Sequence, residues 1–421
     1  MRRPLAAIVA VSVVALLIVL VVALGPRPPV HETLPALAVG EPTFVSTLEA
    51  HLATPVLAGN RVTPLLNGDE IFPAKLAAVR AARTSITYAE YFWGEGVIGQ
   101  QLADALAERC RAGVPVKVLL DGVGTLNMPA AHLQAMERAG CRVVSFRSLA
   151  AWDPRRHNYR NHRRILVVDG RVGISGGSGV SDKWAGDGRH QGHWRDTDVR
   201  VEGPAVEWMQ AAFAENWREA TREVLGGPAY FPGQQPPAGD VRVQIVRSSP
   251  TGGSYAAYTM ALLAMASARR SILVTNPYFV LDERMIDALT DAIRRGVRVV
   301  ALTPGQIDHN IVRSASRRDF GRLLQAGLEI FEYQPALLHA KTVVVDDSWA
   351  TIGSTNLDNR SFALNDELNV AVYDPRFARR LAEVFERDLQ HARRVDHETW
   401  RRRGLKERIM ETLVLPLRDL L

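Results

Sequence analysis

The stretch that decides the fold is Leu-His-Ala-Lys-Thr-Val-Val-Val-Asp, residues 338–346, followed by Gly-Ser-Thr-Asn at 353–356. Side chains two apart on a strand point to the same face, so His339 and Lys341 are predicted to share one surface. The β-branched run after them predicts a buried strand. An imidazole, an ammonium and the amide of Asn356 on one surface suit a phosphate group. The simpler alternative is a buried strand with polar ends.

A second copy of this pattern lies earlier in the chain, in His-Arg-Arg-Ile-Leu-Val-Val-Asp. There His162, Arg164 and Asp169 repeat the spacing of the later histidine, lysine and Asp346. Each aspartate is followed by a turn of small residues, which in the first copy is Gly-Gly-Ser-Gly at 176–179. The likeness extends upstream, because 81–92 parallels 268–279. A repeat of this kind indicates two half-domains that bring both histidines to one site.

Two His-x-Lys-x4-Asp motifs are the mark of the phospholipase D superfamily, which the chain resembles, and within it the bacterial cardiolipin synthases. The local matches are Gly353–Glu367, Asn158–Arg163 and Trp194–Val206. The resemblance implies an α/β fold of two phospholipase D-like α-β-α half-domains packed about a pseudo-twofold axis. It also implies an enzyme without cofactor or metal that transfers a phosphatidyl group between phospholipids such as phosphatidylglycerol or cardiolipin.

The mechanism that the resemblance implies runs through a phosphohistidine. One histidine attacks phosphorus, and the other protonates the leaving alcohol and then takes the proton of the acceptor. We assign the attack to His162 and the acid/base role to His339. The non-bridging oxygens would be held by Lys341, Arg164 and Asn356. If water is the acceptor, the protein is a phosphodiesterase on lipid or nucleic acid; the net charge of +6 argues weakly against nucleic acid.

Each histidine also needs an acceptor on its other ring nitrogen. Glu-Leu-Asn-Val-Ala-Val lines up with Asp-Thr-Asp-Val-Arg-Val, which predicts Glu367 and Asp196 as the orienting carboxylates. A surface ion pair is the alternative for either one. The motif aspartates, Asp169 and Asp346, are interpreted as structural, each tying down the turn after its strand.

The first motif departs from the family pattern at two positions. Arg164 stands where the family has lysine; it keeps the charge but has another shape. Gly179 stands where the family has asparagine, which removes a donor, and Ser178 is a candidate replacement. These departures motivate a further hypothesis, a non-catalytic relative that only binds lipid.

The flanking segments complete the prediction. Residues 5–24 are an uncharged apolar run long enough to span a bilayer, preceded by Arg2 and Arg3. We therefore expect a single-pass anchor over 1–26 in a bacterial cell membrane, with the catalytic body outside the cytoplasm; a cleaved signal peptide is the alternative. The expected divisions of the remaining chain are a linker at 27–64, a first half at 65–225, a linker at 226–239 and a second half at 240–421.

Three local predictions remain. The only two cysteines, Cys110 and Cys141, form a disulfide if the body lies outside the cytoplasm, or stay separate. A proline in a first helical turn predicts a charged helix over 375–394. The basic amphipathic end at 400–421 either packs on the core or touches a membrane.

Overall fold

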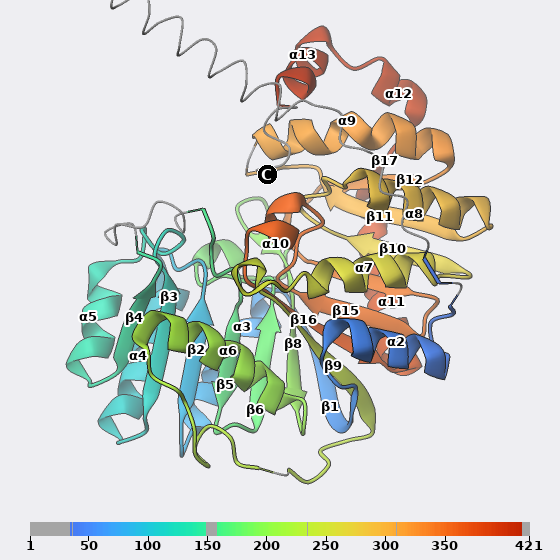
Figure 1. The fold of residues 1–421 in the computed structure, drawn as a ribbon. Coiled ribbons are helices and arrows are strands. Elements are labelled where there is room, and N and C mark those ends of the chain that lie inside the picture. The colour runs from blue at the N-terminus through green and yellow to red at the C-terminus, as the bar shows by residue number, and fades with distance from the viewer. Residues whose placement is uncertain (1–33, 36, 149–157, 234, 309, 415–421) are drawn as a thin grey trace, which may run out of the picture.

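The computed structural model describes residues 34–414 except 36, 149–157, 234 and 309 (Figure 1). The predicted anchor over 1–26 and its orientation lie outside the described residues. Among the residues that are described, no helix is both long and apolar enough to cross a bilayer.

Within the described residues, one sheet of 15 strands runs through the molecule in the order β17-β12-β11-β10-β14-β15-β16-β9-β1-β8-β6-β5-β2-β3-β4. Its strands are β1 (Leu57–Leu66), β2 (Ile86–Glu90), β3 (Val116–Asp121), β4 (Arg142–Phe146), β5 (Ile165–Val168), β6 (Val172–Gly176), β8 (Thr197–Glu202), β9 (Val241–Ser248), β10 (Ser271–Thr275), β11 (Arg298–Pro304), β12 (Glu329–Tyr333), β14 (Thr342–Val345), β15 (Trp349–Gly353), β16 (Glu367–Tyr373) and β17 (Ala392–Val395). A separate pair joins β7 (Trp194–Arg195) to β13 (Leu337–Leu338).

The strand order contains the sequence repeat. One group of strands reads β4-β3-β2-β5-β6-β8-β1, and the other reads β12-β11-β10-β14-β15-β16-β9, with β17 added at the edge. In each group the first three strands are parallel and the rest antiparallel. Strands β5 and β14, which follow the two histidines, carry β-branched and leucine side chains that are almost entirely buried, as expected for strands covered on both faces.

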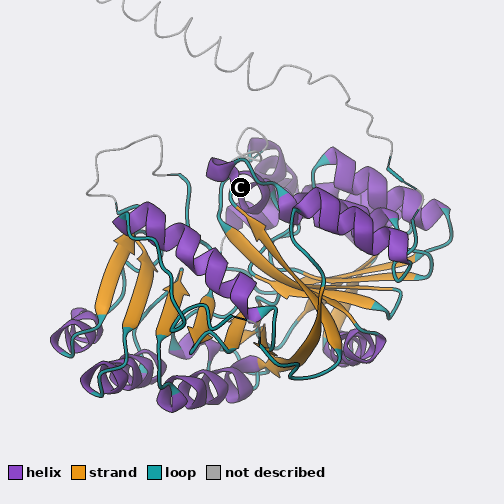
Figure 2. Cartoon of the chain, turned by 60° about the horizontal axis from the view of Figure 1, so that its bottom comes forward, coloured by secondary structure: helices purple, strands orange, loops and turns teal. Residues whose placement is uncertain are grey.

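The two groups join where β1 pairs with β9, and the register of that pair is irregular between Leu57 and Asn60. The sheet folds back there, since β6 and β8 contact β15, and β6 also contacts β16. Figure 2 shows the two groups of strands turned relative to each other. Helices α6 (Val206–Thr221) and α11 (Pro375–Leu389) contribute to the apolar core that both groups share.

The remaining long helices cover the outer faces. The first group packs against α3 (Asn67–Ala81), α4 (Val97–Arg111) and α5 (Ala130–Arg138). The second packs against α2 (Pro42–Leu52), α7 (Ala256–Ala266), α8 (Glu283–Arg294) and α9 (Asn310–Ala326). Shorter helices are η1 (Asp182–Trp184), η2 (Pro250–Gly252), α10 (Asn359–Ala363), α12 (His397–Arg401) and α13 (Leu405–Leu413).

Two predictions about segments are wrong. The supposed linker at 27–64 contains α2 and most of β1, because Phe44 and Leu48 are fully buried in the core of the second group. The helix expected over 375–394 ends at Leu389, and Ala392–Val395 form the edge strand β17 on β12. Arg393 pairs there with the buried Glu332, an ion pair that the strand geometry provides.

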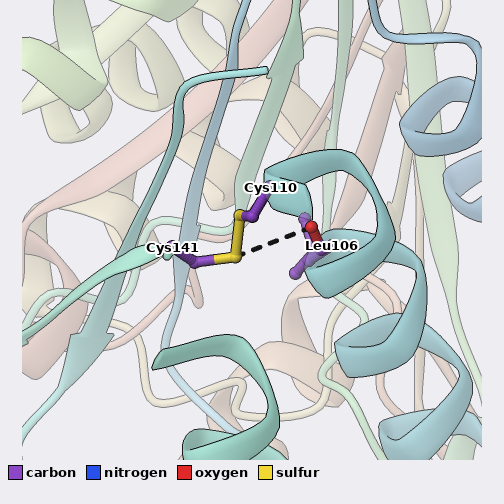
Figure 3. The surroundings of a disulfide bond; sticks show 3 residues. All are labelled: Leu106, Cys110 and Cys141. Carbon is purple, nitrogen blue, oxygen red and sulfur yellow. Dashed lines mark hydrogen bonds between the residues drawn. A yellow bond between two sulfur atoms is a disulfide. The ribbon is translucent and has the colours of Figure 1, made fainter. Parts of the chain in front are cut away.

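The two cysteines form a disulfide (Figure 3). Cys110 lies at the end of α4, and Cys141 lies directly before β4. The sulfur of Cys141 is 3.6 Å from the carbonyl oxygen of Leu106. The bridge therefore ties the last turn of α4 to the start of β4.

Candidate active site

The backbone of each histidine is held by the other half of the chain. The His162 N–H donates to the carbonyl of Asp366 at 2.9 Å, and the His339 N–H donates to the carbonyl of Arg195 at 2.7 Å. In both cases the acceptor is the residue just before a predicted orienting carboxylate. The two sequence copies are thus interlocked at the histidines.

Each predicted carboxylate likewise contacts the histidine of the other half. Both oxygens of Glu367 lie near Nδ1 of His162, at 2.9 and 3.1 Å. Asp196 Oδ2 lies 2.7 Å from Nδ1 of His339. Both carboxylates are fully buried, which excludes the surface ion pair. An ionised carboxylate at Nδ1 places the proton of a neutral ring on that nitrogen and leaves the lone pair on Nε2.

Further donors keep each carboxylate in place. Glu367 accepts a hydrogen bond from the Ser354 hydroxyl. Asp196 accepts the indole N–H of Trp184 at 2.8 Å and the backbone N–H of Thr197 at 2.8 Å. Burial by itself would raise the pKa of either carboxyl, but the adjacent histidine and these donors outweigh it, so both pKa values lie below the ordinary range.

The two cations of the motifs stand beside the free ring nitrogens. Arg164 directs Nη2 to Nε2 of His162 at 3.1 Å, and its Nε lies 3.8 Å from the buried Glu90. Lys341 places its ammonium over the edge of the His339 ring, 3.2 Å from Nε2 and 3.1 Å from Nδ1. A phosphate that approaches either Nε2 therefore meets a positive charge.

Burial dominates the protonation of the three central groups. Burial lowers the pKa of His162 to about 4, with Arg164 adding to the shift. Burial and the ammonium of Lys341 lower the pKa of His339 to about 4. Burial also lowers the pKa of Lys341 to about 7. Near neutral pH both imidazoles are consequently uncharged, with Nε2 able to attack or to accept a proton.

Gly179, the second departure from the family pattern, has a structural cause. A Cβ atom at this position would lie 2.9 Å from Cη2 and 3.0 Å from Cζ3 of Trp184. The indole occupies the space that a longer side chain would need. Its ring also contacts His339 at a centroid distance of 5.4 Å. Ser178, the candidate replacement, is bonded to Asp198 and Lys75 instead.

The other predicted residues divide into two kinds. Asn356 is buried in the loop after β15, and among the described residues its Oδ1 has no hydrogen-bond partner. Asp169 and Asp346 lie at the far ends of β5 and β14, away from the histidines. They accept backbone N–H groups of 83–85 and 269–271, respectively. Their side chains hold the turns that enter β2 and β10, whereas we expected them to hold the turns that follow their own strands.

Several residues of the site escaped the sequence analysis. The ring of Tyr91 lies 4.8 Å from that of His162, and the ring of Trp194 lies 5.1 Å from that of His339. Tyr91 is repeated as Tyr278 in the upstream part of the duplication, a signal that could have identified it. Trp184 had no such signal, because nothing in the spacing of the motif relates it to Asp196.

Comparisons with known proteins agree with this geometry. The family described as "Cardiolipin synthase, PLD-like domain" matches residues 76–217 and 262–389. Cardiolipin synthase A of Pseudomonas entomophila is 38% identical over 345 residues, which are 82% of this chain and 71% of that protein. Cardiolipin synthase 1 of Bacillus cereus is 35% identical over 373 residues, 86% of this chain and 73% of that protein.

A solved structure shares the fold. Phosphatidylserine synthase from Haemophilus influenzae superposes with a TM-score of 0.68 at 15% identity, over 90% of this chain and 100% of that one. At this identity the likeness concerns the fold alone. The family match and the two bacterial relatives go further: this chain belongs to the cardiolipin synthase family of the phospholipase D superfamily.

Proposed function

We propose that the protein is a phosphatidyltransferase that moves a phosphatidyl group from one phospholipid to the alcohol of another, forming cardiolipin or a related lipid. The observation that carries this proposal is the pair of crossed histidine–carboxylate contacts with a cation beside each free Nε2. Two oriented imidazoles around an anion site suit a reaction in two steps through a covalent intermediate.

In the first step, Nε2 of His162 attacks the phosphorus of the donor lipid. The N–P bond forms, the P–O bond to the headgroup breaks, and His339 delivers a proton to the leaving alcohol. The bound phosphate adds a negative charge beside His339, which favours the protonated ring needed for this delivery. In the second step, the acceptor hydroxyl attacks, His339 takes its proton, and the N–P bond breaks.

The surrounding side chains stabilise the charges that develop on the histidines and on the phosphate oxygens during the reaction. Glu367 stabilises the positive charge of the phosphorylated His162, and Asp196 does the same for protonated His339. The non-bridging oxygens are held by Arg164, Lys341 and the amide of Asn356. Arginine in place of lysine is compatible with this role, because its fork also binds phosphate. Assigning the attack to His162 rather than His339 follows the resemblance to the superfamily.

We infer that the two sequence halves, 65–225 and 240–421, act as one unit about a pseudo-twofold axis. Each half contributes one histidine, and the carboxylate that contacts this histidine comes from the other half. We place this unit on the extracytoplasmic side of a bacterial membrane, held there by residues 1–26. The disulfide supports that side, because such bonds persist in oxidising compartments.

A lipid assay tests the proposal. Purified protein and His339→Ala are incubated with phosphatidylglycerol in mixed micelles, and products are identified by mass spectrometry. We expect cardiolipin from the unmodified protein and none from the variant. Phosphatidic acid as the sole product would make the protein a hydrolase. No product from any phospholipid would reject the proposal and direct attention to non-lipid phosphodiesters or to lipid binding alone.

A further inference from the structure

A groove of about 620 Å³ opens beside the site in the first half of the chain. Its lining includes Phe92, Glu95, Asn127, Lys183, Gln191 and His193. Two of these residues adjoin the site in sequence: Phe92 follows Tyr91, which contacts His162, and His193 precedes Trp194, which contacts His339. In space the groove lies one ring away from His339. The ring of Phe92 contacts that of Trp184, the ammonium of Lys183 contacts that of Trp194, and both tryptophans contact His339.

Lys183 supplies the cation of this groove. Its ammonium lies 5.4 Å from the ring centroid of Phe92 and 5.6 Å from that of Trp194. The neighbouring carboxylate, Asp182, also lines the groove, but its oxygens accept the first N–H groups of α4, from Val97 and Ile98, at 3.0 and 2.9 Å. Lys183 is exposed, so its charge is available to a ligand in the groove.

The other polar side chains suit hydroxyl groups. Glu95, Asn127 and Gln191 are exposed and offer carboxylate and amide groups, which bind alcohols as acceptors and donors. Phe92 adds an apolar wall against which carbon-bound hydrogens can pack. One cation with several hydroxyl-binding groups matches a polyol that carries a single phosphate diester, which is the chemistry of a glycerophosphate headgroup.

We propose that this groove binds the headgroup of the acceptor phospholipid, with Lys183 paired to the phosphate of the acceptor. The proposal rests on the transferase function above and names the subsite that the second substrate uses. A hydroxyl of the bound headgroup then reaches the phosphorus on His162; the new P–O bond forms, the N–P bond breaks, and the hydroxyl proton passes to His339. Water has no phosphate for Lys183, so the groove favours transfer over hydrolysis.

The test measures how the covalent intermediate divides between acceptors. Transfer gives cardiolipin and hydrolysis gives phosphatidic acid, both from the same phosphohistidine, so their ratio is independent of donor binding. We expect Lys183→Gln to lower the ratio of cardiolipin to phosphatidic acid about tenfold, the effect of losing one charged hydrogen bond. Lys183→Arg should restore most of the ratio, since the charge is kept.

Two controls test whether the effect of Lys183 depends on the phosphate of the acceptor and on this particular lysine. Deuterated glycerol is an acceptor that has hydroxyls and no phosphate. The ratio of deuterated phosphatidylglycerol to phosphatidic acid should therefore be the same in Lys183→Gln as in the unmodified protein. The matched substitution Lys117→Gln removes a lysine that is bonded to Glu223 and does not line the groove, and should leave the ratio unchanged.

The outcomes are distinct. An unchanged cardiolipin ratio in Lys183→Gln overturns the proposal and leaves the transferase function standing. An equal loss with glycerol and with phosphatidylglycerol also overturns it, because Lys183 would then act on the reaction and not on the acceptor phosphate. If the unmodified protein yields no product from either acceptor or from water, the transferase function fails and the subsite with it.

Discussion

Trp184 explains, at the scale of single residues, why the first motif can lack its asparagine. The indole fills the space beside Gly179 and donates its N–H to the carboxylate that orients His339. The glycine makes room for the tryptophan, whose N–H reaches the carboxylate that contacts the histidine of the opposite half.

We expect Trp184→Phe to reduce kcat about tenfold, because Asp196 loses a buried donor worth about 1.4 kcal/mol. Phenylalanine keeps a ring against His339, so the melting temperature should change little. Steady-state kinetics and a thermal melt check both expectations. Trp194→Phe is the control, since this ring contacts His339 without a hydrogen bond to Asp196. Equal losses in the two variants would mean that ring packing matters and the indole N–H does not.

The pH dependence of the reaction follows from Lys341, His162 and His339. Burial lowers the pKa of Lys341 to about 7, so its charge is present below that pH and is lost above it. Burial lowers the pKa of His162 to about 4, so the attacking nitrogen is protonated only below that pH. His339 must carry the proton that it delivers, and burial lowers its pKa to about 4 as well, so its protonated fraction declines above that pH. We expect kcat/KM to fall above about pH 4 and to fall more steeply above pH 7, where Lys341 also loses its charge.

Lys341→Arg tests the alkaline limb of that profile. Arginine remains charged at all accessible pH values, so the additional steepness above pH 7 should disappear even if the variant is slower. The measurement is kcat/KM across pH at constant ionic strength. Additional steepness that persists unchanged in Lys341→Arg would assign the limb to another group.

At the scale of elements, Arg163 connects the strand that follows His162 to the second half. Its side chain is fully buried. The guanidinium donates to the carbonyls of Ala212, Ser248 and Glu367 and to the side chains of Glu215 and Asn216. One side chain thus links α6, β9 and β16 next to the site. Spacing gives no signal for Arg163, because it occupies the variable position between His162 and Arg164, where the second copy has Ala340.

We expect Arg163→Met to lower the free energy of unfolding by about 3–5 kcal/mol, because Glu215 and several buried carbonyls lose their partner. Activity should fall as well, since Glu367 is held through its backbone. Urea unfolding followed by fluorescence measures the change. The exposed Arg171→Met serves as the control and should stay within about 0.5 kcal/mol of the unmodified protein. Similar unfolding midpoints for both variants would contradict the role given to Arg163.

At the scale of the whole molecule, the disulfide acts on stability and leaves the site untouched. It joins the end of α4 to the start of β4, whereas the histidines lie toward the opposite ends of the parallel strands. The bridged cysteines are 31 residues apart, a loop whose closure stabilises the fold by about 3–4 kcal/mol in the chain-entropy account.

We expect the double variant Cys110→Ser, Cys141→Ser to lose about that much stability while its kcat remains within about twofold at a temperature where it is folded. Calorimetry and the lipid assay give the two quantities. Reducing agent should lower the melting temperature of the unmodified protein and leave that of the double variant unchanged. A reducing agent without effect on either would show that the bridge does not form in solution.

The sequence by itself determined the class of the fold, the duplication of its motif and most residues of the candidate site. Period-two alternation placed His339 and Lys341 on one face, and the repeat identified their counterparts together with Glu367 and Asp196. It failed at 42–64, although Phe44, Leu48 and Leu52 recur at helical spacing, because a short polar-flanked segment gives no sign that a core lies beside it.

Only the tertiary structure decided which carboxylate serves which histidine, and why position 179 is glycine. The pairing of Glu367 with His162 joins segments that are about two hundred residues apart. The requirement for glycine at position 179 comes from the ring of Trp184, which lies in a different turn. Local spacing specifies which face a side chain occupies on its own strand. It carries no information about the partner that folding brings to that face, since that depends on how the two groups of strands fold onto each other.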